Sequence, residues 1–85
     1  MFYKDKTILI TGVCGTVGQE ILQVLIDKKD DSPASIIGLD NNETELFFLQ
    51  QKFLSCQNLN LCLVDITNNR DVCNVLKNVD IVLHG

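Results

Sequence analysis

Apolar and polar positions alternate along this chain with two different periods, and the change of period predicts its secondary structure. Short, nearly continuous apolar runs are typical of strands that are buried on both faces. Such runs occur at residues 7–11, 35–40, 59–65 and 79–85. Between them, apolar residues recur at the spacing of helices that bury one face, over residues 17–29, 41–54 and 67–78.

Each predicted helix has a face that we expect to pack against the strands. In the first helix that face consists of Val17, Ile21, Val24 and Leu25. The second helix begins with a capping box, with Asn42 at the N-cap and Glu45 three residues later. Its aromatic residues, which we expect to be buried against the sheet, are Phe47, Phe48 and Phe53. The third helix presents Val72, Val75 and Leu76.

The order of these elements predicts an α/β fold. Four apolar strands alternate with three helices, which is typical of a parallel sheet with helices on both faces. Right-handed crossovers then fix how each strand joins the next. Periodicity alone supports no more than a general α/β domain.

Composition limits what such a domain does. With 85 residues and a net charge of −4, the chain forms one small acidic domain without the basic surface that nucleic acids require. No apolar run is long enough to span a membrane, and no secretory signal is present. The cysteines show neither a C-x-x-C pair nor a zinc spacing, so we expect free thiols in the cytoplasm; they are Cys14, Cys56, Cys62 and Cys73.

The stretch TGVCGTVG (residues 11–18) adds chemistry to this fold, because it follows the first strand and opens the first helix. In that setting Gly12 permits a tight turn and Gly15 permits close approach of a pyrophosphate. Gly18 lets the helix pack closely on the strand. The exposed amides at the helix start then face the phosphate charge, as in a Rossmann-type dinucleotide site. The alternative is a glycine-rich turn without a ligand, which this structural context disfavours.

Asp40 ends the second strand, where a carboxylate can accept hydrogen bonds from both hydroxyls of an adenosine ribose. Its distance from the glycines exceeds the usual spacing, which a longer surface loop through DDSPAS (residues 30–35) explains. The alternative role for Asp40 is an N-cap of the second helix. Because Asp40 would repel a 2′-phosphate and neither Asn41 nor Asn42 compensates it, NAD is favoured, with NADP as the alternative.

TGVCGTVG resembles the T-G-x-x-G-x-x-G signature of the extended short-chain dehydrogenase/reductase family, and the resemblance continues to the end of the chain. VDIT (residues 64–67) resembles the family's third-strand ending, which implies that Asp65 contacts the adenine amino group and that Ile66 lies beside the ring. VDIVLHG (residues 79–85) resembles its fourth strand, with alanine usual in place of Gly85. The resemblance is greatest to nucleotide-sugar 4,6-dehydratases of polysaccharide and nonulosonic-acid biosynthesis.

These observations assign cofactor contacts to four segments of the chain, and no catalytic residue or metal ligand. We expect the contacts at Gly12, Val13, Cys14, Gly15, Thr16, Val17, Gly18, Asp40, Asn41, Asp65, Ile66, Leu83, His84 and Gly85. Catalysis by His84 is disfavoured, since the family's strand-end histidine is structural or lines the cofactor site. For Cys14, a lowered pKa beside the helix N-terminus is the alternative to a simple filling role.

The family's catalytic Tyr-x-x-x-Lys pair is missing. The single tyrosine, Tyr3, precedes the first strand, and Lys6 follows it by three residues instead of four. The resemblance therefore implies that residues 1–85 are the N-terminal part of an NAD(P)-binding domain, truncated relative to the family, without the substrate domain and inactive alone. The whole enzyme would be a cytoplasmic homo-oligomer acting on a nucleotide sugar. Alternatives are an epimerase or reductase of the same family, or a non-catalytic dinucleotide-binding regulator.

Overall fold

The computed structural model describes residues 2–65, 67, 70, 74 and 76–85. Within them the elements are β1 (Thr7–Thr11), α1 (Thr16–Asp27), β2 (Ser35–Asp40), α2 (Glu43–Lys52), β3 (Leu59–Leu63) and β4 (Ile81–His84). The strands predicted at 7–11 and 35–40 are confirmed with the same bounds, and the two later ones are shorter than predicted. Most of the helix predicted over 67–78, with Val72, Cys73 and Val75, lies outside the described residues.

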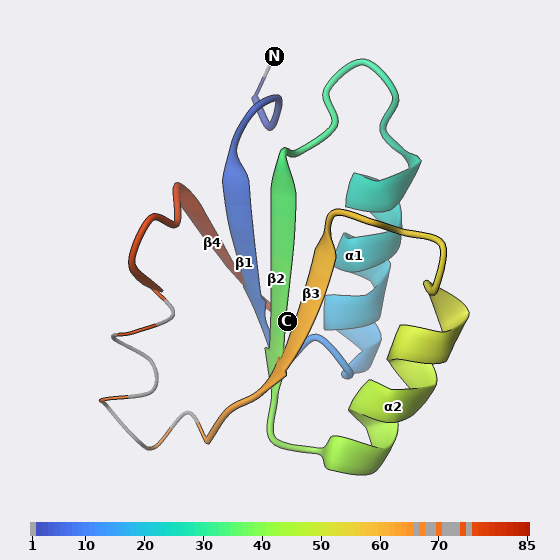
Figure 1. The fold of residues 1–85 in the computed structure, drawn as a ribbon, viewed down its shortest axis with the longest axis vertical. Coiled ribbons are helices and arrows are strands. Elements are labelled where there is room, and N and C mark those ends of the chain that lie inside the picture. The colour runs from blue at the N-terminus through green and yellow to red at the C-terminus, as the bar shows by residue number, and fades with distance from the viewer. Residues whose placement is uncertain (1, 66, 68–69, 71–73, 75) are drawn as a thin grey trace.

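The described strands form one parallel sheet in the order β3-β2-β1-β4 (Figure 1). Thr11 lies opposite Leu39 on one side and His84 on the other, so β1, β2 and β4 end at the same edge. The chain runs outward from β1 to β3 and then returns to the other side of β1. The order therefore reverses between β1 and β4, and ligands of open α/β sheets bind beyond the carboxyl ends of the strands at such a point.

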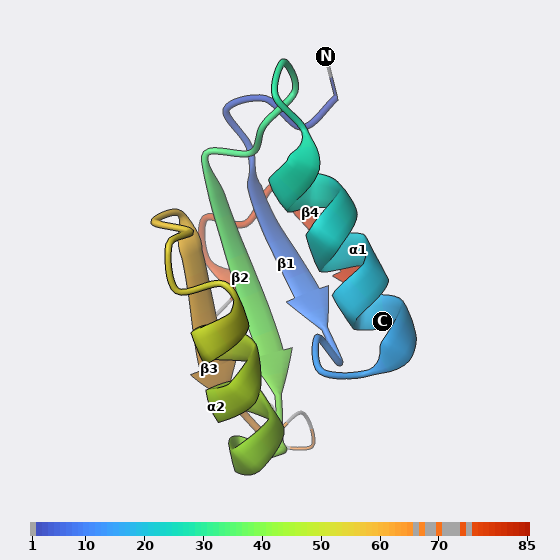
Figure 2. The same ribbon diagram turned by 90° about the vertical axis from the view of Figure 1, so that its right-hand side faces the viewer.

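Both described helices cover the same face of the sheet (Figures 1 and 2). Side chains from β1 and β2 meet α1 and α2 there in one core, whose fully buried members include Ile8, Ile10, Leu22 and Ile36. On the opposite face Leu9, Leu39 and Val64 form a second buried group. The strands are thus apolar on both faces, as their sequences predict.

The buried face of α1 differs from the predicted one. Gly18, Leu22 and Leu25 are buried, whereas Val17 and Val24 are 55% and 58% exposed. Glycine does not count as apolar in a hydropathy pattern, so the pattern indicates the neighbouring residues Val17, Ile21 and Val24 instead of the face that contains Gly18. These three residues line a groove of about 370 Å³ together with Tyr3 and Leu83.

In α2 the capping box is confirmed at its N-cap, because the Asn42 side chain accepts the Glu45 N–H at 3.1 Å. The predicted burial of Phe47 and Phe48 is wrong, since these side chains are 58% and 60% exposed. The side chains that face the core are Leu46, Leu49 and the half-buried Phe53. Leu49 and Phe53 follow Leu46 by three and seven residues, which places all three on one face of the helix.

A single carboxylate fixes the chain before β1. Asp31 accepts backbone N–H groups of Phe2, Tyr3 and Lys4 at 3.1, 2.8 and 2.8 Å. Desolvation alone would raise the pKa of Asp31, but these three hydrogen bonds outweigh it and hold the pKa below its ordinary value of 3.8. Tyr3 is thereby held against the core.

We expect Asp31→Asn to lower the thermal midpoint at neutral pH, because an amide oxygen cannot serve three donors as a carboxylate does. A depressed native pKa adds stability above the unfolded pKa, and that stability is lost as the pH falls through the native value. The difference in midpoint between variant and wild type should therefore be largest near pH 6 to 7 and shrink below about pH 4. Calorimetry across this range, with the exposed neighbour Asp30→Asn as control, checks it; a pH-independent difference would contradict it.

Candidate dinucleotide-binding site

The candidate site lies at the edge where β1, β2 and β4 end. β1 leads into the turn Gly12–Gly15, β2 ends in Asp40, and β4 is followed by Gly85. The Val13 N–H of this turn donates to the Leu39 carbonyl of β2 at 3.1 Å, and the Gly85 N–H donates to the carbonyl of Thr11, the last residue of β1, at 2.8 Å. The sheet thus brings three of the predicted segments to one edge, and the fourth, after β3, lies at the same edge because Leu63 pairs with Asp40.

The turn leaves only certain amides for a ligand. The Cys14 N–H donates to Asp40 and the Gly15 N–H to the Gly12 carbonyl, at 3.0 Å in each case. The next amides, at Thr16, Val17 and Gly18, open α1, where the first N–H groups lack intrahelical acceptors. The N-cap is Gly15, so no side chain at that position competes for them. A phosphate is suited to this helix start by hydrogen bonding and by the helix dipole.

Gly12, Gly18 and Gly85 are required by the fold itself. Gly12 has φ of +62°, a conformation that side chains disfavour. A Cβ on Gly18 would overlap the Gly12 carbonyl oxygen and lie 2.8 Å from the Val13 Cα. A Cβ on Gly85 would lie 2.6 Å from the Gly18 Cα. The family's usual alanine at position 85 would therefore force the end of β4 away from the turn.

Gly15 differs from these glycines. Its φ is −71°, an ordinary value, and a Cβ there would meet only the Gly12 carbonyl oxygen at 3.4 Å, which is normal van der Waals contact. Neither the backbone conformation nor the packing thus explains a glycine at position 15. Close approach of a pyrophosphate, the role predicted for Gly15, remains a prediction.

Asp40 ties the end of β2 to the turn. One carboxylate oxygen accepts the Cys14 N–H at 3.0 Å, and the other accepts the Asn42 N–H at 3.1 Å. The N-cap of α2 is Asn42, so the capping role considered for Asp40 is wrong. Each carboxylate oxygen retains acceptor capacity, which leaves Asp40 able to bind ribose hydroxyls.

The environment of Cys14 excludes a reactive thiolate. Burial, then the negative charges of Asp40 and Glu45, and a hydrogen bond to Asp40 raise the pKa of the Cys14 thiol to about 11. The lowered pKa considered from the sequence is therefore wrong, because burial and the neighbouring carboxylates raise the pKa. The thiol remains protonated at neutral pH.

The adenine-side prediction rests on the end of β3. The Val64 N–H donates to the Asp40 carbonyl at 3.0 Å, which places this strand end beside Asp40. Hydrogen bonds from the hydroxyl and the backbone N–H of Thr67, at 2.6 and 2.9 Å, lower the pKa of Asp65. Both reach the same oxygen, Oδ1, so Thr67 leaves Oδ2 of Asp65 open as an acceptor. The contact with the adenine amino group remains a prediction. Ile66 lies outside the described residues.

At the end of β4, the Thr11 hydroxyl lies 2.7 Å from Nδ1 of His84, so the two strand ends that flank the switch point are joined through side chains. Leu83 instead packs into the core on the helix face. Asn41 is exposed beside Asp40. The cofactor contacts predicted for these residues remain predictions.

Two residues of the site were missed by sequence reasoning. Thr11 opens the glycine signature but is not among the predicted contacts, although its hydroxyl lies within hydrogen-bond distance of His84. Gln19 follows the last glycine of the motif, and its side-chain Nε2 donates to the Cys14 carbonyl at 2.8 Å. A polar side chain one residue after Gly18, close to a turn rich in carbonyl groups, was the available signal.

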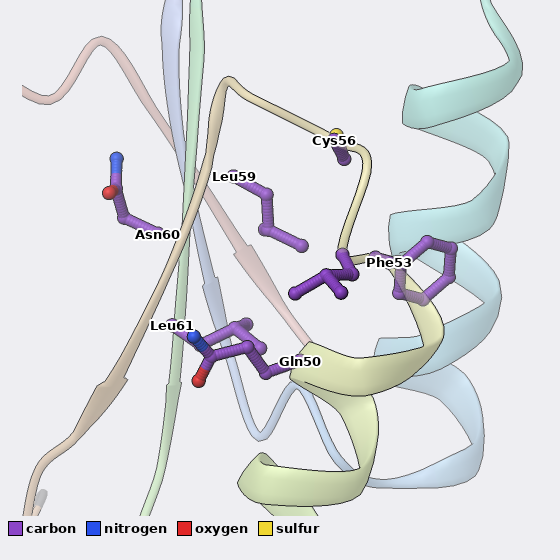
Figure 3. Close-up of a pocket in the computed structure, with 7 residues that line it drawn as sticks. Gln50, Phe53, Cys56, Leu59, Asn60 and Leu61 are labelled. Carbon is purple, nitrogen blue, oxygen red and sulfur yellow. The ribbon is translucent and has the colours of Figure 1, made fainter.

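A further cavity of about 210 Å³ opens between the end of α2 and β3 (Figure 3). Leu59 and Leu61 of β3 and Phe53 form its apolar wall, with the Gln50 amide beside them, whereas the Asn60 side chain points to the other side of β3. Leu59 pairs with Ile36 near the amino ends of the strands. This cavity therefore lies away from the glycine turn, at the other end of the sheet.

Comparison with known proteins identifies the family. The family model described as "Polysaccharide biosynthesis protein" matches residues 8–85. The chain belongs to this family. The match also confirms the resemblance to extended short-chain dehydrogenase/reductases, as does the parallel-sheet fold.

Similar proteins are much longer than this chain. An uncharacterized membrane protein of Methanocaldococcus jannaschii is 37% identical over 84 residues, which are 99% of this chain and 24% of that protein. The structure of Pen from Bacillus thuringiensis shares 33% identity with a TM-score of 0.86, over 96% of this chain and 24% of that one. No helix in the described part of this chain is long and apolar enough to cross a membrane.

A UDP-glucuronic acid 4-epimerase mutant from Bacillus cereus, solved with a fluorinated UDP-sugar and NAD, has the same fold. It shares 24% identity and a TM-score of 0.71, over 92% of this chain and 25% of that one. At this identity the likeness shows the fold alone. The chain thus spans about a quarter of the length of each of these proteins.

The glycines separate folding from ligand binding in a way that stability measurements can check. We expect Gly18→Ala to lower the free energy of unfolding by about 2 kcal/mol or more, because its Cβ meets rigid backbone. Gly15→Ala should change the free energy by less than about 1 kcal/mol, because its Cβ fits. Urea unfolding measures both, and equal losses would contradict the distinction.

Alkylation reports the state of Cys14. Because a thiolate is the nucleophile, reaction of Cys14 with iodoacetamide should be slow at pH 8 and rise toward pH 11. In urea-denatured chain the rise should instead centre near the ordinary value of 9.0. Mass spectrometry of the peptide that contains Cys14 measures the rate. A plateau by pH 8 in the folded chain would contradict the raised pKa.

Proposed function

We propose that this chain is the NAD(P)-binding portion of a longer enzyme that modifies a nucleotide sugar in polysaccharide biosynthesis. The observation that carries the proposal is that a glycine stands at position 15, although neither backbone strain nor packing requires one there. Gly15 directly precedes the first turn of α1, whose amides have no side-chain cap. The family match supports the biosynthetic context. The chain covers about a quarter of the length of its relatives, which supports the interpretation that it is the N-terminal part of a domain.

The residues present fit a nicotinamide dinucleotide. The amides of Thr16, Val17 and Gly18 would bind the pyrophosphate, and Asp40 the adenosine ribose. Asp65 would accept from the adenine amino group. A 2′-phosphate beside Asp40 would meet a negative charge, which supports NAD over NADP. When bound, the cofactor supplies hydride acceptance and donation.

For the whole enzyme we favour a 4,6-dehydratase, in which the sugar is oxidised at C4, loses water across C5 and C6, and regains the hydride. This choice rests on the sequence resemblance. This chain's own part is to bind and orient, because it contains neither a Tyr-x-x-x-Lys pair nor another tyrosine besides Tyr3. Epimerase or reductase chemistry would use the same residues here. The cytoplasmic location and the homo-oligomeric state remain predictions.

Titration with NAD tests the proposal directly. We expect weak binding by the 85-residue chain, because half of the dinucleotide site is absent. Gly15→Val should weaken it by about tenfold or more, because its side chain occupies the space of the pyrophosphate, and Gly15→Ala should weaken it less. NADP should bind less tightly than NAD.

Calorimetry provides the affinities, and circular dichroism confirms that each variant is folded. The assignment of the phosphate cradle fails if Gly15→Val and wild type give equal heats. The assignment of a dinucleotide fails if the folded wild-type chain binds neither NAD nor NADP.

A further inference from the structure

Two side chains from different elements hold Cys14 within the glycine turn. Its backbone N–H donates to a carboxylate oxygen of Asp40 at 3.0 Å, from the end of β2. Its carbonyl oxygen accepts from Nε2 of Gln19 at 2.8 Å, from the first turn of α1. Cys14, which directly precedes Gly15, is therefore held on both of its backbone polar groups.

The second of these bonds fixes the peptide that leads into the helix. That peptide joins the Cys14 carbonyl to the Gly15 N–H, and the N–H donates to the Gly12 carbonyl at 3.0 Å. The backbone N–H of Gln19 in turn donates to the Gly15 carbonyl at 2.9 Å. Gly15 lacks a Cβ to limit its conformation, so these hydrogen bonds set the direction of the next amides.

The chemistry of Gln19 suits this task. Only a donor can pair with a carbonyl oxygen, and a glutamine amide supplies one without adding a charge near the phosphate site. Its side chain is half-buried and lines a small cavity together with Leu49 and Lys52 of α2. Its hydrogen bond to the Cys14 carbonyl is present without a ligand, so the restraint on Cys14 does not depend on one.

We propose that Gln19 is a positioning residue that holds the glycine turn in its pyrophosphate-binding form before the ligand arrives. The proposal rests on the proposed dinucleotide function and adds a residue outside the glycine motif to it. Preorganisation of this kind raises affinity because the ordering cost is met in folding instead of in binding. Its effect belongs to the pyrophosphate and not to the adenosine.

The test compares Gln19→Met with Gln23→Met in the 85-residue chain. Methionine keeps the length and bulk of glutamine but cannot donate a hydrogen bond. Gln23 lies one turn later on α1, where its Nε2 donates to Asp27 at 3.0 Å on the exposed surface, so it is a matched control. NAD, which carries the pyrophosphate, and adenosine, which lacks it, are titrated into each protein and followed by NMR.

We expect Gln19→Met to bind NAD about three- to tenfold more weakly, the range for one neutral hydrogen bond, with unchanged affinity for adenosine. Gln23→Met should match wild type for both ligands. Unchanged NAD binding in folded Gln19→Met overturns the proposal, as does an equal loss for NAD and adenosine. If Gln19→Met unfolds, Gln19→Leu is measured by the same two ligands and judged by the same outcomes.

Failure of the proposed function is distinguishable from failure of this inference. A wild-type chain that is folded and binds neither ligand contradicts the dinucleotide site as a whole. A wild-type chain that binds NAD, with a Gln19→Met variant that binds equally well, contradicts the positioning role alone.

Discussion

The contact among three glycine backbones at the switch point is the constraint on which the rest of the site depends. Gly12 turns the chain with a positive φ, Gly18 packs α1 onto that turn, and Gly85 packs the end of β4 onto Gly18. No side chain larger than hydrogen fits between these elements without displacement of backbone. The close approach places the start of α1 directly over the strand ends, which is where the helix dipole and the free amides can act on a phosphate.

Negatively charged side chains lie near the start of α1 and would influence which ligand binds there. Asp40 holds the turn through the Cys14 N–H and so stands beside any group bound there. Together with burial, the same carboxylate raises the pKa of the Cys14 thiol, and its charge would repel a phosphate placed beside it. One side chain therefore shapes the turn and contributes to the state of the thiol beside it.

The sequence predicts most of the sheet because apolar runs and turn residues are local signals. β1 and β2 have their predicted bounds, and the N-cap of α2 is the predicted Asn42. The helix faces are harder: Gly18 is buried yet carries no hydropathy, and the large Phe47 and Phe48 are exposed because Leu46 and Leu49 take the inward positions.

Site details that depend on tertiary contacts are beyond a sequence pattern. The spacing of the motif identifies Gly12, Gly15 and Gly18 equally. Only their neighbouring atoms show that the fold requires a glycine at positions 12 and 18 and does not require one at position 15. The pKa of Cys14 likewise depends on a carboxylate 26 residues away. Because Gly12 and Gly18 are needed for the packing of the turn and Gly15 is not, a change at Gly15 separates the folding of the turn from any binding of a ligand to it.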